Sequence, residues 1–361
     1  MPSPIQLSIT SSMPSTIPSS MDMPTAIDQV VRRIDLSTGD MLAVMHLIMS
    51  GEATGAQIGG FLVGLRMKGE TVDEIVAAAT VMRELSTPVT TTIDDIVDTC
   101  GTGGSGSNKF NVSTAAVFVA AAAGVHIAKH GNRGASSKSG SADVLEAAGA
   151  NIMLSPPQVA RCIETVGAGF LFALNHHSAM KHAIGPRREM VTRTIFNVLG
   201  PLTNPAGAKR QVLGVYDRQW LRPMAEVLKM LGSIHVMVVH SADGLDEISI
   251  AAETYVAELK DGEITEYTIK PEDFNVQRQG IDTLIVDDSA SSLVLVELAL
   301  NGKHEAATDI VALNAGAAIY VSGLCSSLTA GVEMAQDAIG GGLATEKMKD
   351  FVDFTCQISG L

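Results

Sequence analysis

The fold of this chain is decided by the run Asp98-Thr-Cys-Gly-Thr-Gly-Gly-Ser-Gly-Ser-Asn-Lys-Phe-Asn-Val-Ser-Thr114. An apolar, strand-like lead enters a glycine-rich turn, and we expect a helix to begin at Asn111 or Ser113. Glycine carries no Cβ, so the backbone turns sharply and a ligand can approach it closely. The free N–H groups at a helix start favour an anion, such as a phosphate or pyrophosphate. A tight strand-to-helix connection without a ligand is the alternative that this turn alone leaves open.

A second polar segment is Lys129-His-Gly-Asn-Arg-Gly-Ala-Ser-Ser-Lys-Ser-Gly-Ser-Ala-Asp143, which follows the short apolar run 125–128. Its polar groups could not be satisfied inside a core. Lys129 and Arg133 supply positive charge, and the Ser and Asn side chains supply hydrogen bonds, which together suit a charged, hydroxyl-rich ligand. A solvated surface loop is the alternative. The position after a predicted strand favours the ligand, because α/β proteins bind ligands at strand ends.

A third cluster, Asp243-Gly-Leu-Asp-Glu-Ile-Ser249, follows the strand-like run 235–240. An adjacent Asp-Glu pair is usually a solvated turn. Beside two phosphate-type loops, however, Asp246 and Glu247 predict a magnesium site, because Mg²⁺ binds one or two carboxylates and bridges to substrate phosphates.

In order and spacing, these clusters resemble the anthranilate phosphoribosyltransferase family of tryptophan biosynthesis, over about residues 26 to 345. The matching segments are Gly101-Thr-Gly-Gly104, Asn111-Val-Ser-Thr114, Lys129-His-Gly-Asn-Arg133, Ser136-Ser137, Gly140-Ser-Ala-Asp143, Arg187, Arg193-Thr-Ile-Phe-Asn-Val-Leu-Gly-Pro-Leu-Thr-Asn-Pro205 and Asp246-Glu247. The resemblance implies transfer of the phosphoribosyl group of phosphoribosyl pyrophosphate to the amine of anthranilate, with release of pyrophosphate.

The resemblance also implies which residues bind each ligand. Phosphoribosyl pyrophosphate would contact Gly101, Gly104, Ser105, Lys109, Asn111, Val112, Ser113, Thr114, Lys129, His130, Gly131, Asn132, Arg133, Gly134, Ala135, Ser136, Ser137 and Ser141. Magnesium would be held by Ser113, Asp246 and Glu247, and anthranilate would contact Gly101, Asn132, His177, Arg187 and Pro201.

The implied chemistry assigns catalytic roles to Lys129, Arg187 and His130. Because pyrophosphate leaves as positive charge develops at the ribose C1, the protein must neutralise the leaving group and orient the amine. Magnesium and Lys129 would serve the first task. The guanidinium fork of Arg187 would serve the second by matching the anthranilate carboxylate. His130 and His177 are candidates for proton handling, with hydrogen bonding or packing as the alternative.

The chain departs from the family pattern at three positions. Ser105 stands where most members have Asp, Lys109 stands where a small hydroxyl residue is usual, and Ser178 stands where Pro is common. The first two changes make the glycine-rich loop more positive by about two charge units. The number of magnesium ions, about two per subunit in the family, is therefore left open here.

The composition excludes some classes of partner. The chain has 361 residues with 46% hydrophobic content, enough for a sizeable core, and two domains are expected. A formal net charge of −14 argues against non-specific nucleic-acid binding. No segment reaches the roughly 18 apolar residues of a membrane span. Four cysteines lie far apart in the sequence and predict reduced thiols in a cytoplasmic protein.

The chain is predicted to form a small all-helical domain and a larger α/β domain with a central, mostly parallel sheet. Residues 1–25 read as a disordered extension, residues 26–92 as the helical domain completed by part of 180–210, and residues 93–361 as the domain that binds phosphoribosyl pyrophosphate. Helix starts are expected at Ser37, Thr54 and Thr71, the last two as capping boxes. Strands are expected at 95–99, 125–128, 151–153, 170–173, 212–215 and 235–240, a hairpin at 258–264, and helices after Ser289.

Two other functions remain open from the sequence alone. A pyrimidine nucleoside phosphorylase has a similar phosphate loop but no use for paired metal carboxylates. A non-catalytic nucleic-acid-binding paralogue would carry a basic face. The family resemblance further implies a homodimer formed through the helical domain, and a separate chain for any anthranilate synthase.

Overall fold

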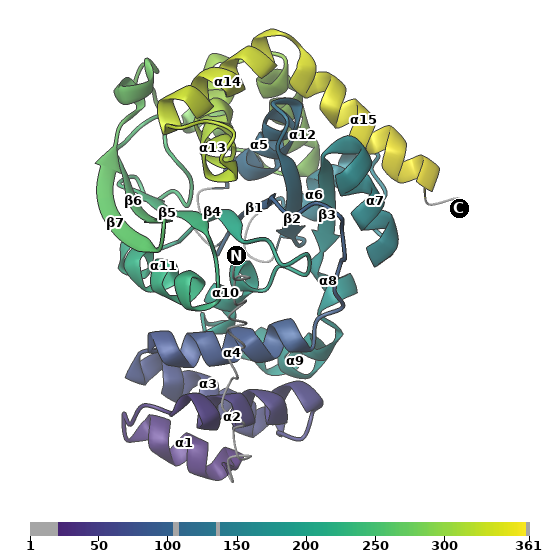
Figure 1. Cartoon of the computed structure of the whole chain (residues 1–361). Helices are drawn as coiled ribbons and strands as arrows, with labels where there is room; N and C mark the ends of the chain where they lie inside the picture. Colours follow the sequence, from purple (N-terminus) through teal and green to yellow (C-terminus); the bar gives the residue numbers. More distant parts are fainter. Residues whose placement is uncertain (1–20, 104–107, 135–137, 359–361) are drawn as a thin grey trace, which may run out of the picture.

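The computed structural model describes residues 21–103, 108–134 and 138–358. A group of helices lies at one end of the molecule, and a sheet with helices on both faces forms the rest (Figure 1). This arrangement confirms the predicted fold class.

The helical part consists of α1 (Met23–Val31), α2 (Thr38–Ser50), α3 (Gly55–Lys68), α4 (Val72–Glu84) and, from later in the chain, α9 (Lys181–Met190). Side chains start these helices as predicted. Ser37 caps α2, and the pairs Thr54–Gln57 and Thr71–Glu74 form capping boxes at α3 and α4. Within this part α1 packs on α3, α2 packs on α4, and α9 lies against α2 and α3.

The first helix begins earlier than the sequence predicted. Helix α1 starts at Met23, because the Asp22 carboxylate accepts a hydrogen bond from the Thr25 backbone N–H and Pro24 suits the first turn. Residues 23–25 are therefore helical and not part of a disordered extension. Residues 1–20 of that predicted extension lie outside the described residues.

Seven strands form one sheet in the order β3-β2-β1-β4-β5-β6-β7. Their bounds are β1 Ile96–Gly101, β2 His126–Gly131, β3 Ala168–Phe172, β4 Arg210–Gly214, β5 His235–Ser241, β6 Thr254–Lys260 and β7 Glu263–Ile269. The first five strands in this order pair in parallel. Strand β6 pairs antiparallel with β5, and β7 pairs antiparallel with β6. Asp261 and Gly262 join β6 to β7 with φ of 51° and 79°, which confirms the predicted hairpin.

The predicted strand at 151–153 is wrong. This segment is a loop, in which the Asn151 N–H bonds to the Thr355 hydroxyl and the Met153 N–H bonds to the Asn151 side chain. Side chains satisfy these backbone donors, so no neighbouring strand is needed. Met153 is exposed, which the short segment Asn151-Ile-Met153 did not reveal.

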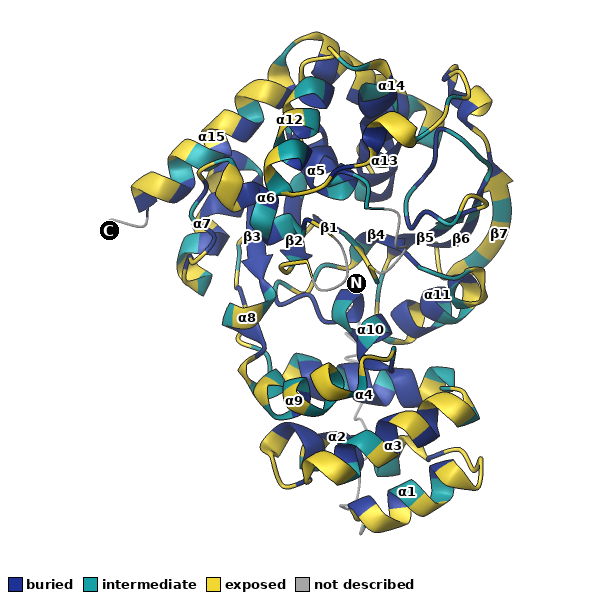
Figure 2. Ribbon diagram, turned by 180° about the vertical axis from the view of Figure 1, so that it is seen from behind, coloured by how far each residue is buried: buried dark blue, intermediate teal, exposed yellow. Residues whose placement is uncertain are grey.

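Two layers of helices cover the sheet. One face carries α5 (Val112–Ala122), α12 (Ser289–Leu300), α13 (Glu305–Ser322), α14 (Leu328–Gly340) and α15 (Leu343–Ile358). Helix α6 (Ser141–Ala147) belongs to the same layer, and α10 (Phe196–Leu199) and α11 (Leu221–Met230) lie in the apolar cluster of the other face. Helices α7 (Pro156–Val166) and α8 (Ala173–His176) pack beside β3. Figure 2 shows the buried strands between the two layers.

Alternate residues of the central strands enter different apolar clusters, as the period of two requires. Met237 and Val239 of β5 face the cluster that contains α5 and α13. Val236 and Val238 face a second cluster, which is shared by α11 and the helical part. Helix α4 contacts α11 directly. The helical part is therefore joined to the sheet by continuous apolar packing.

The chain order around the sheet creates a site for a ligand. After β1 the chain moves to β2 and β3 on one side, and β4 and β5 lie on the other side of β1. Loops that leave β1 and β4 therefore diverge at the carboxyl ends of the strands, and α/β proteins bind ligands in the crevice at such a point. Among the described residues, none of the helices has the length and apolar character to cross a membrane.

Candidate active site

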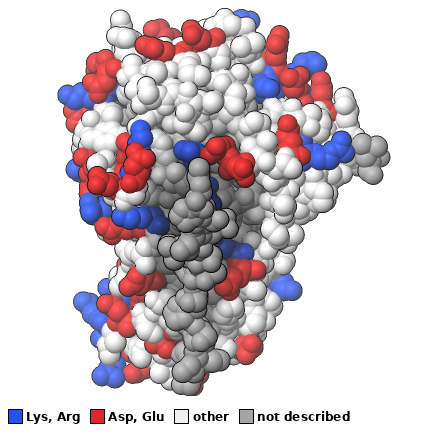
Figure 3. All heavy atoms as spheres, viewed as in Figure 1, with Lys and Arg blue, Asp and Glu red and all other residues white. Residues whose placement is uncertain are grey.

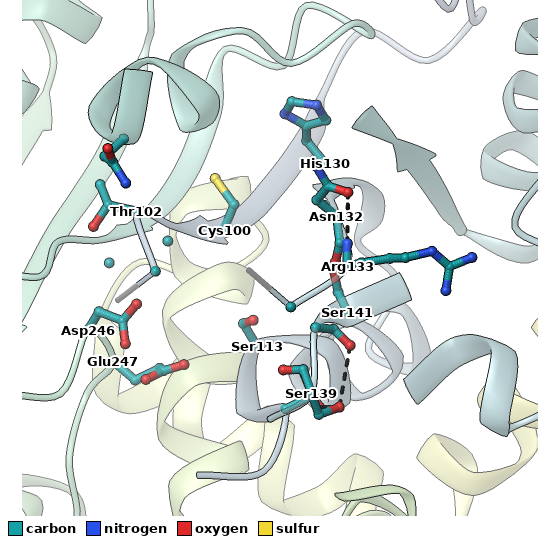
Figure 4. A pocket seen from close by; sticks show the side chains of 18 of the residues that line it. Cys100, Thr102, Ser113, His130, Asn132, Arg133, Ser139, Ser141, Asp246 and Glu247 are labelled. Atoms are coloured by element: carbon teal, nitrogen blue, oxygen red, sulfur yellow. Dashed lines mark hydrogen bonds between the residues drawn. The ribbon is translucent and has the colours of Figure 1, made fainter. Parts of the chain in front are cut away.

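A cavity of about 940 Å³ opens at the carboxyl ends of β1, β2 and β4. One wall comes from the glycine-rich loop and the start of α5, a second from residues 129–134 and 139–141, and a third from Asp246 and Glu247. Ile184, Arg187, Arg188 and Val191 of the α9 region close the side that faces the helical part. Figure 4 shows Asp246 and Glu247 side by side on one side of the pocket, with Ser113 between them and Ser139 and Ser141.

Glycines at the strand ends let the loops come together. A Cβ on Gly214 would overlap the backbone carbonyl oxygen of Asp246, and a Cβ on Gly101 would lie 2.9 Å from the Asp246 Oδ2. Any other residue at the end of β4 would push the acidic loop away from the cavity. A Cβ on Gly131 would likewise overlap the Ser141 hydroxyl. Close approach of backbones therefore sets the shape of the site.

Asn111 links three segments at the base of the cavity. Its Oδ1 accepts hydrogen bonds at 2.7 Å from both the Ser139 and the Ser292 hydroxyls, and its backbone N–H donates to the Ser292 Oγ at 3.0 Å. Its Nδ2 also donates to the Ser139 carbonyl at 3.3 Å. The start of α5 is thereby fixed to the second loop and to α12. Ser139 and Ser292 were not identified from the sequence, because only the fold brings them to Asn111.

Arg133 does not point its charge into the cavity. Its guanidinium pairs with Asp143 at 3.1 Å and with Glu146, both on α6, and lies over the Phe172 ring. Figure 4 shows its side chain extending away from the other labelled residues. Asp143 also accepts hydrogen bonds at 2.9 Å from the backbone N–H groups of Gly134 and Gly140. In this structure Arg133 holds the loop in place, a role that differs from the predicted ligand contact.

Lys129 forms part of the cavity wall but is almost fully buried. Its ammonium donates to the Thr99 carbonyl and, at 3.2 Å, to the Ser113 hydroxyl, and only 3% of the residue is exposed. Burial lowers the pKa of Lys129, and the nearby Asp98 opposes this. Asp98 is itself buried and accepts the His130 backbone N–H. Lys129 thus contributes positive charge below Ser113.

Asp246 and Glu247 both pair with Lys109. The Lys109 Nζ lies 2.9 Å from the Asp246 Oδ1 and 2.6 Å from the Glu247 Oε2. Burial raises the pKa of Glu247 to about 7 against the effect of Lys109, whereas Lys109 outweighs burial at Asp246 and holds its pKa below the usual value. Lys109 was predicted to contact pyrophosphate directly, but in this structure its ammonium pairs with the predicted metal carboxylates.

The donor set of this cluster fits magnesium. The described residues contain no group of three or more His, Cys, Asp or Glu side chains arranged to hold a metal. Two adjacent carboxylates with a hydroxyl nearby match an ion that takes its other ligands from water and substrate phosphates. Asp246, Glu247 and Ser113 are therefore suitable for Mg²⁺ and poorly suited to a metal that needs a complete protein cage.

His130 and His177 lie together, with ring centroids 5.1 Å apart. Burial lowers the pKa of His130 to about 3 and that of His177 to about 4, and mutual repulsion of the histidine cluster adds to this. Both imidazoles are therefore neutral near pH 7 and are weak proton acceptors. His130 lines the cavity, whereas His177 packs behind it.

The structure brings together many, but not all, of the predicted site residues. The cavity wall includes Gly101, Lys109, Asn111, Ser113, Lys129, His130, Gly131, Asn132, Arg133, Gly134, Ser141, Arg187, Asp246 and Glu247. It does not include Val112, Thr114, His177 or Pro201, which are buried beside it. Gly104, Ser105, Ala135, Ser136 and Ser137 lie outside the described residues.

Several residues of the wall were not singled out from the sequence. They are Thr102, Asn108, Ser139, Gly140, Arg188, Thr192, Arg193 and Asn197. Arg193 and Asn197 belong to the segment 193–205 that carried the family resemblance, and this was the signal that could have identified them.

Comparison with known proteins places this chain in a family. Residues 93–345 match the model described as "Glycosyl transferase family, a/b domain", and residues 24–86 match the "Glycosyl transferase family, helical bundle domain". An anthranilate phosphoribosyltransferase from Marinomonas sp. (strain MWYL1) is 65% identical over 337 residues, which cover 93% of this chain and 97% of the relative. This chain belongs to the anthranilate phosphoribosyltransferase family.

Other members of the family agree in sequence and in fold. The anthranilate phosphoribosyltransferase of Cellvibrio japonicus (strain Ueda107) is 62% identical, covering 93% of this chain and 99% of that protein. The crystal structure of the Thermus thermophilus enzyme superposes with a TM-score of 0.87 at 40% identity, covering 92% of this chain and 99% of that one. The Saccharomyces cerevisiae enzyme, in complex with PRPP and Mg, shares the fold with a TM-score of 0.85 at 24% identity, covering 93% and 98%.

The buried histidines predict a pH-dependent stability. The pKa of His130 is about 3 in the folded chain and about 6.5 when exposed, so the unfolded state binds its proton first as pH falls. The contribution of neutral His130 to stability is therefore complete above about pH 6.5 and is lost progressively as pH falls below it. Urea unfolding at about pH 7.5 and about pH 5.5 measures the loss. We expect His130→Gln to lose less stability than the wild type over this interval, by about 1 kcal/mol. Equal losses would contradict a neutral, buried His130.

Proposed function

We propose that this chain transfers the phosphoribosyl group of phosphoribosyl pyrophosphate to the amine of anthranilate, giving N-(5-phosphoribosyl)anthranilate and pyrophosphate. The observation that carries the proposal is one cavity with a phosphate-type loop, a carboxylate pair suited to magnesium and the Arg187 guanidinium around it. Family membership supports the same reaction.

Phosphoribosyl pyrophosphate is anionic, and the chain carries a net charge of −14. Binding therefore depends on the local charge of the cavity, whose wall contains Lys109, Lys129, Arg187, Arg188 and Arg193. Figure 3 shows acidic and basic side chains interspersed over one face, without a broad basic area on it. A cavity enclosed by protein strengthens these local charges relative to the distant acidic ones, because solvent and salt screen the latter.

The backbone of the first loop and the start of α5 would hold the phosphates, with Asn111, Ser113 and Ser141 adding hydrogen bonds. A magnesium ion held by Asp246, Glu247 and Ser113 would supply charge that stabilises the departing pyrophosphate. Lys129 lies below Ser113 and would add positive charge to the same region.

Arg187 is the residue we assign to the anthranilate carboxylate. Its guanidinium stacks on the Phe196 ring at 5.1 Å and lines the cavity on the side of α9. Burial lowers the pKa of Arg187, and no carboxylate of the described residues raises it. A planar fork held by an aromatic face is prepared for bidentate contact with a carboxylate. Gly101 and Asn132 would line the same path, with His177 and Pro201 packed behind it.

No strong base is required for the transfer. The arylamine is neutral near pH 7, so its lone pair is available without proton removal. His130 and His177 are weak proton acceptors at that pH, because burial lowers the pKa of each. The geometry therefore favours catalysis by positioning and by charge stabilisation. We propose a positioning role for His130, beside the acceptor path.

The function predicts a fluorescence change. Anthranilate fluorescence should fall only when the chain, phosphoribosyl pyrophosphate and Mg²⁺ are all present, because the product carries a substituted amine. The assay is a time course with each component omitted in turn. No fall with a correctly folded chain would contradict the transferase, and phosphorolysis of thymidine or uridine would be assayed next.

A substitution at Arg187 should act on the acceptor alone. Arg187→Lys keeps the charge but removes the fork, so we expect the KM for anthranilate to rise about 10- to 100-fold. The KM for phosphoribosyl pyrophosphate should stay within about twofold, and Arg222→Lys, an exposed position on α11 outside the cavity wall, should change neither. Steady-state kinetics with each substrate varied in turn gives both constants. A rise in the phosphoribosyl pyrophosphate KM instead would move Arg187 to the donor site.

We also propose a homodimer formed through the helical part, in a cytoplasmic protein that receives anthranilate from a separate synthase chain. Support for the dimer comes from exposed apolar side chains on α1 and α3: Val31, Val63 and Met67 are 65%, 40% and 69% exposed. Sedimentation velocity should show twice the chain mass of 37.7 kDa, and the pair Val63→Asp and Met67→Asp should give the monomer. A monomeric wild type would exclude the dimer.

A further inference from the structure

The feature that carries a further inference is the place of the Lys109 ammonium between two carboxylates. Its contact with the Asp246 Oδ1 at 2.9 Å has hydrogen-bond geometry, and its contact with the Glu247 Oε2 at 2.6 Å is a close ion pair without that geometry. The side chains of Lys109 and Asp246 are each 9% exposed, and that of Glu247 is 13% exposed. The three groups form a compact, largely buried unit at the cavity wall.

The backbone around Lys109 is fixed, so this contact is built into the fold. Lys109 forms an isolated antiparallel bridge with Ile285. On either side of it, the Val286 N–H donates to the Asn108 carbonyl at 2.9 Å, and the Phe110 N–H donates to the Leu284 carbonyl at 2.9 Å. Asn108 has a φ of 47°, a left-handed conformation that Asn tolerates and that turns the chain into this bridge.

The ammonium occupies the space that a divalent cation needs. Mg²⁺ binds carboxylate oxygens at about 2.0–2.1 Å, and the Lys109 Nζ is already within 3 Å of one oxygen of each carboxylate. Two cations cannot share this space, because their repulsion in a largely buried site is strong. Lys109 and a metal ion must therefore compete for Asp246 and Glu247.

We propose that Lys109 is a tethered cation that pairs with the magnesium-binding carboxylates in the metal-free protein and must be displaced before a divalent cation binds them. This inference rests on the proposed magnesium site. The affinity of the free protein for divalent metal then depends on which residue stands at position 109. The free protein then binds metal weakly and keeps its acidic loop ordered without it.

The helical part contains a matched arrangement that serves as a control. The Lys68 Nζ lies 2.6 Å from the Asp35 Oδ1 and 2.9 Å from the Glu74 Oε2. There the Glu74 oxygens also accept backbone N–H groups of Leu36 and Thr71 at 2.9 and 2.8 Å. Backbone donors already satisfy Glu74, so the loss of Lys68 should destabilise the chain without creating a metal site.

The experiment measures metal binding and melting of the full chain without substrates. Mn²⁺ alone is titrated and followed by electron paramagnetic resonance, and the Tm is recorded with and without Mg²⁺ alone. We expect Lys109→Met and Lys109→Thr to bind Mn²⁺ at least about tenfold more tightly than the wild type. We expect both to melt lower without metal and to regain stability with Mg²⁺, because binding to the folded state stabilises it.

The matched variants decide what the result means. Lys109→Arg keeps a cation and should respond to metal like the wild type, and Lys68→Met should melt lower with no recovery in Mg²⁺. Adding Glu247→Gln to Lys109→Met should abolish the gained Mn²⁺ affinity. Equal Mn²⁺ affinity in the wild type, Lys109→Met and Lys109→Thr would overturn the proposal.

The activity of Glu247→Gln separates that failure from a failure of the proposed function. If its Mg²⁺-dependent activity falls while position 109 has no effect on Mn²⁺ affinity, the magnesium site stands and the role of Lys109 does not. If Glu247→Gln keeps full activity and an unchanged Mg²⁺ requirement, the proposed magnesium site itself is wrong.

Discussion

Contact between the carboxyl end of β4 and the loop that follows β5 is the constraint on which the site depends. Gly214 has no side chain, and the Asp246 carbonyl fills the space that a Cβ would take. This contact brings Asp246 and Glu247 beside the end of β1, where the glycine-rich loop begins. The two loops follow β1 and β5, which lie on either side of β4 and run parallel to it. The crevice between them therefore combines an anion-binding backbone with carboxylates that can hold a cation.

Two of the basic side chains in this crevice are paired with carboxylates at short range. Arg133 is bound by Asp143 and Glu146, and Lys109 is bound by Asp246 and Glu247. Arg187, in contrast, is supported by an aromatic ring. Lys109 and Arg133 thus hold neighbouring segments of the protein in place. The Arg187 guanidinium, on the α9 side, lines the cavity. Such a division places positive charge locally in the cavity of an acidic chain.

Local signals predicted much of this structure from the sequence. Capping residues marked the starts of α2, α3 and α4, and the Asp-Gly turn marked the hairpin, because each depends on neighbours within a few residues. The pairing of Lys109 with Asp246 could not be predicted in this way, since 137 residues separate them. The burial of His130 and His177 and the pairing of Arg133 with α6 likewise depend on tertiary contacts. The prediction of a strand at 151–153 was wrong for the same reason. The Thr355 side chain of α15 accepts the Asn151 N–H in place of a neighbouring strand.

The apolar cluster beneath the sheet has a consequence for how the chain unfolds. Ile75 of α4, Leu228 of α11 and Val238 of β5 belong to the same buried cluster, so the helical part and the sheet share one interior. Separating them would expose apolar surface on both sides at a cost that rises with the exposed area. The two parts are distinct in shape but form a single cooperative unit, and one melting transition is the expected behaviour of the intact chain.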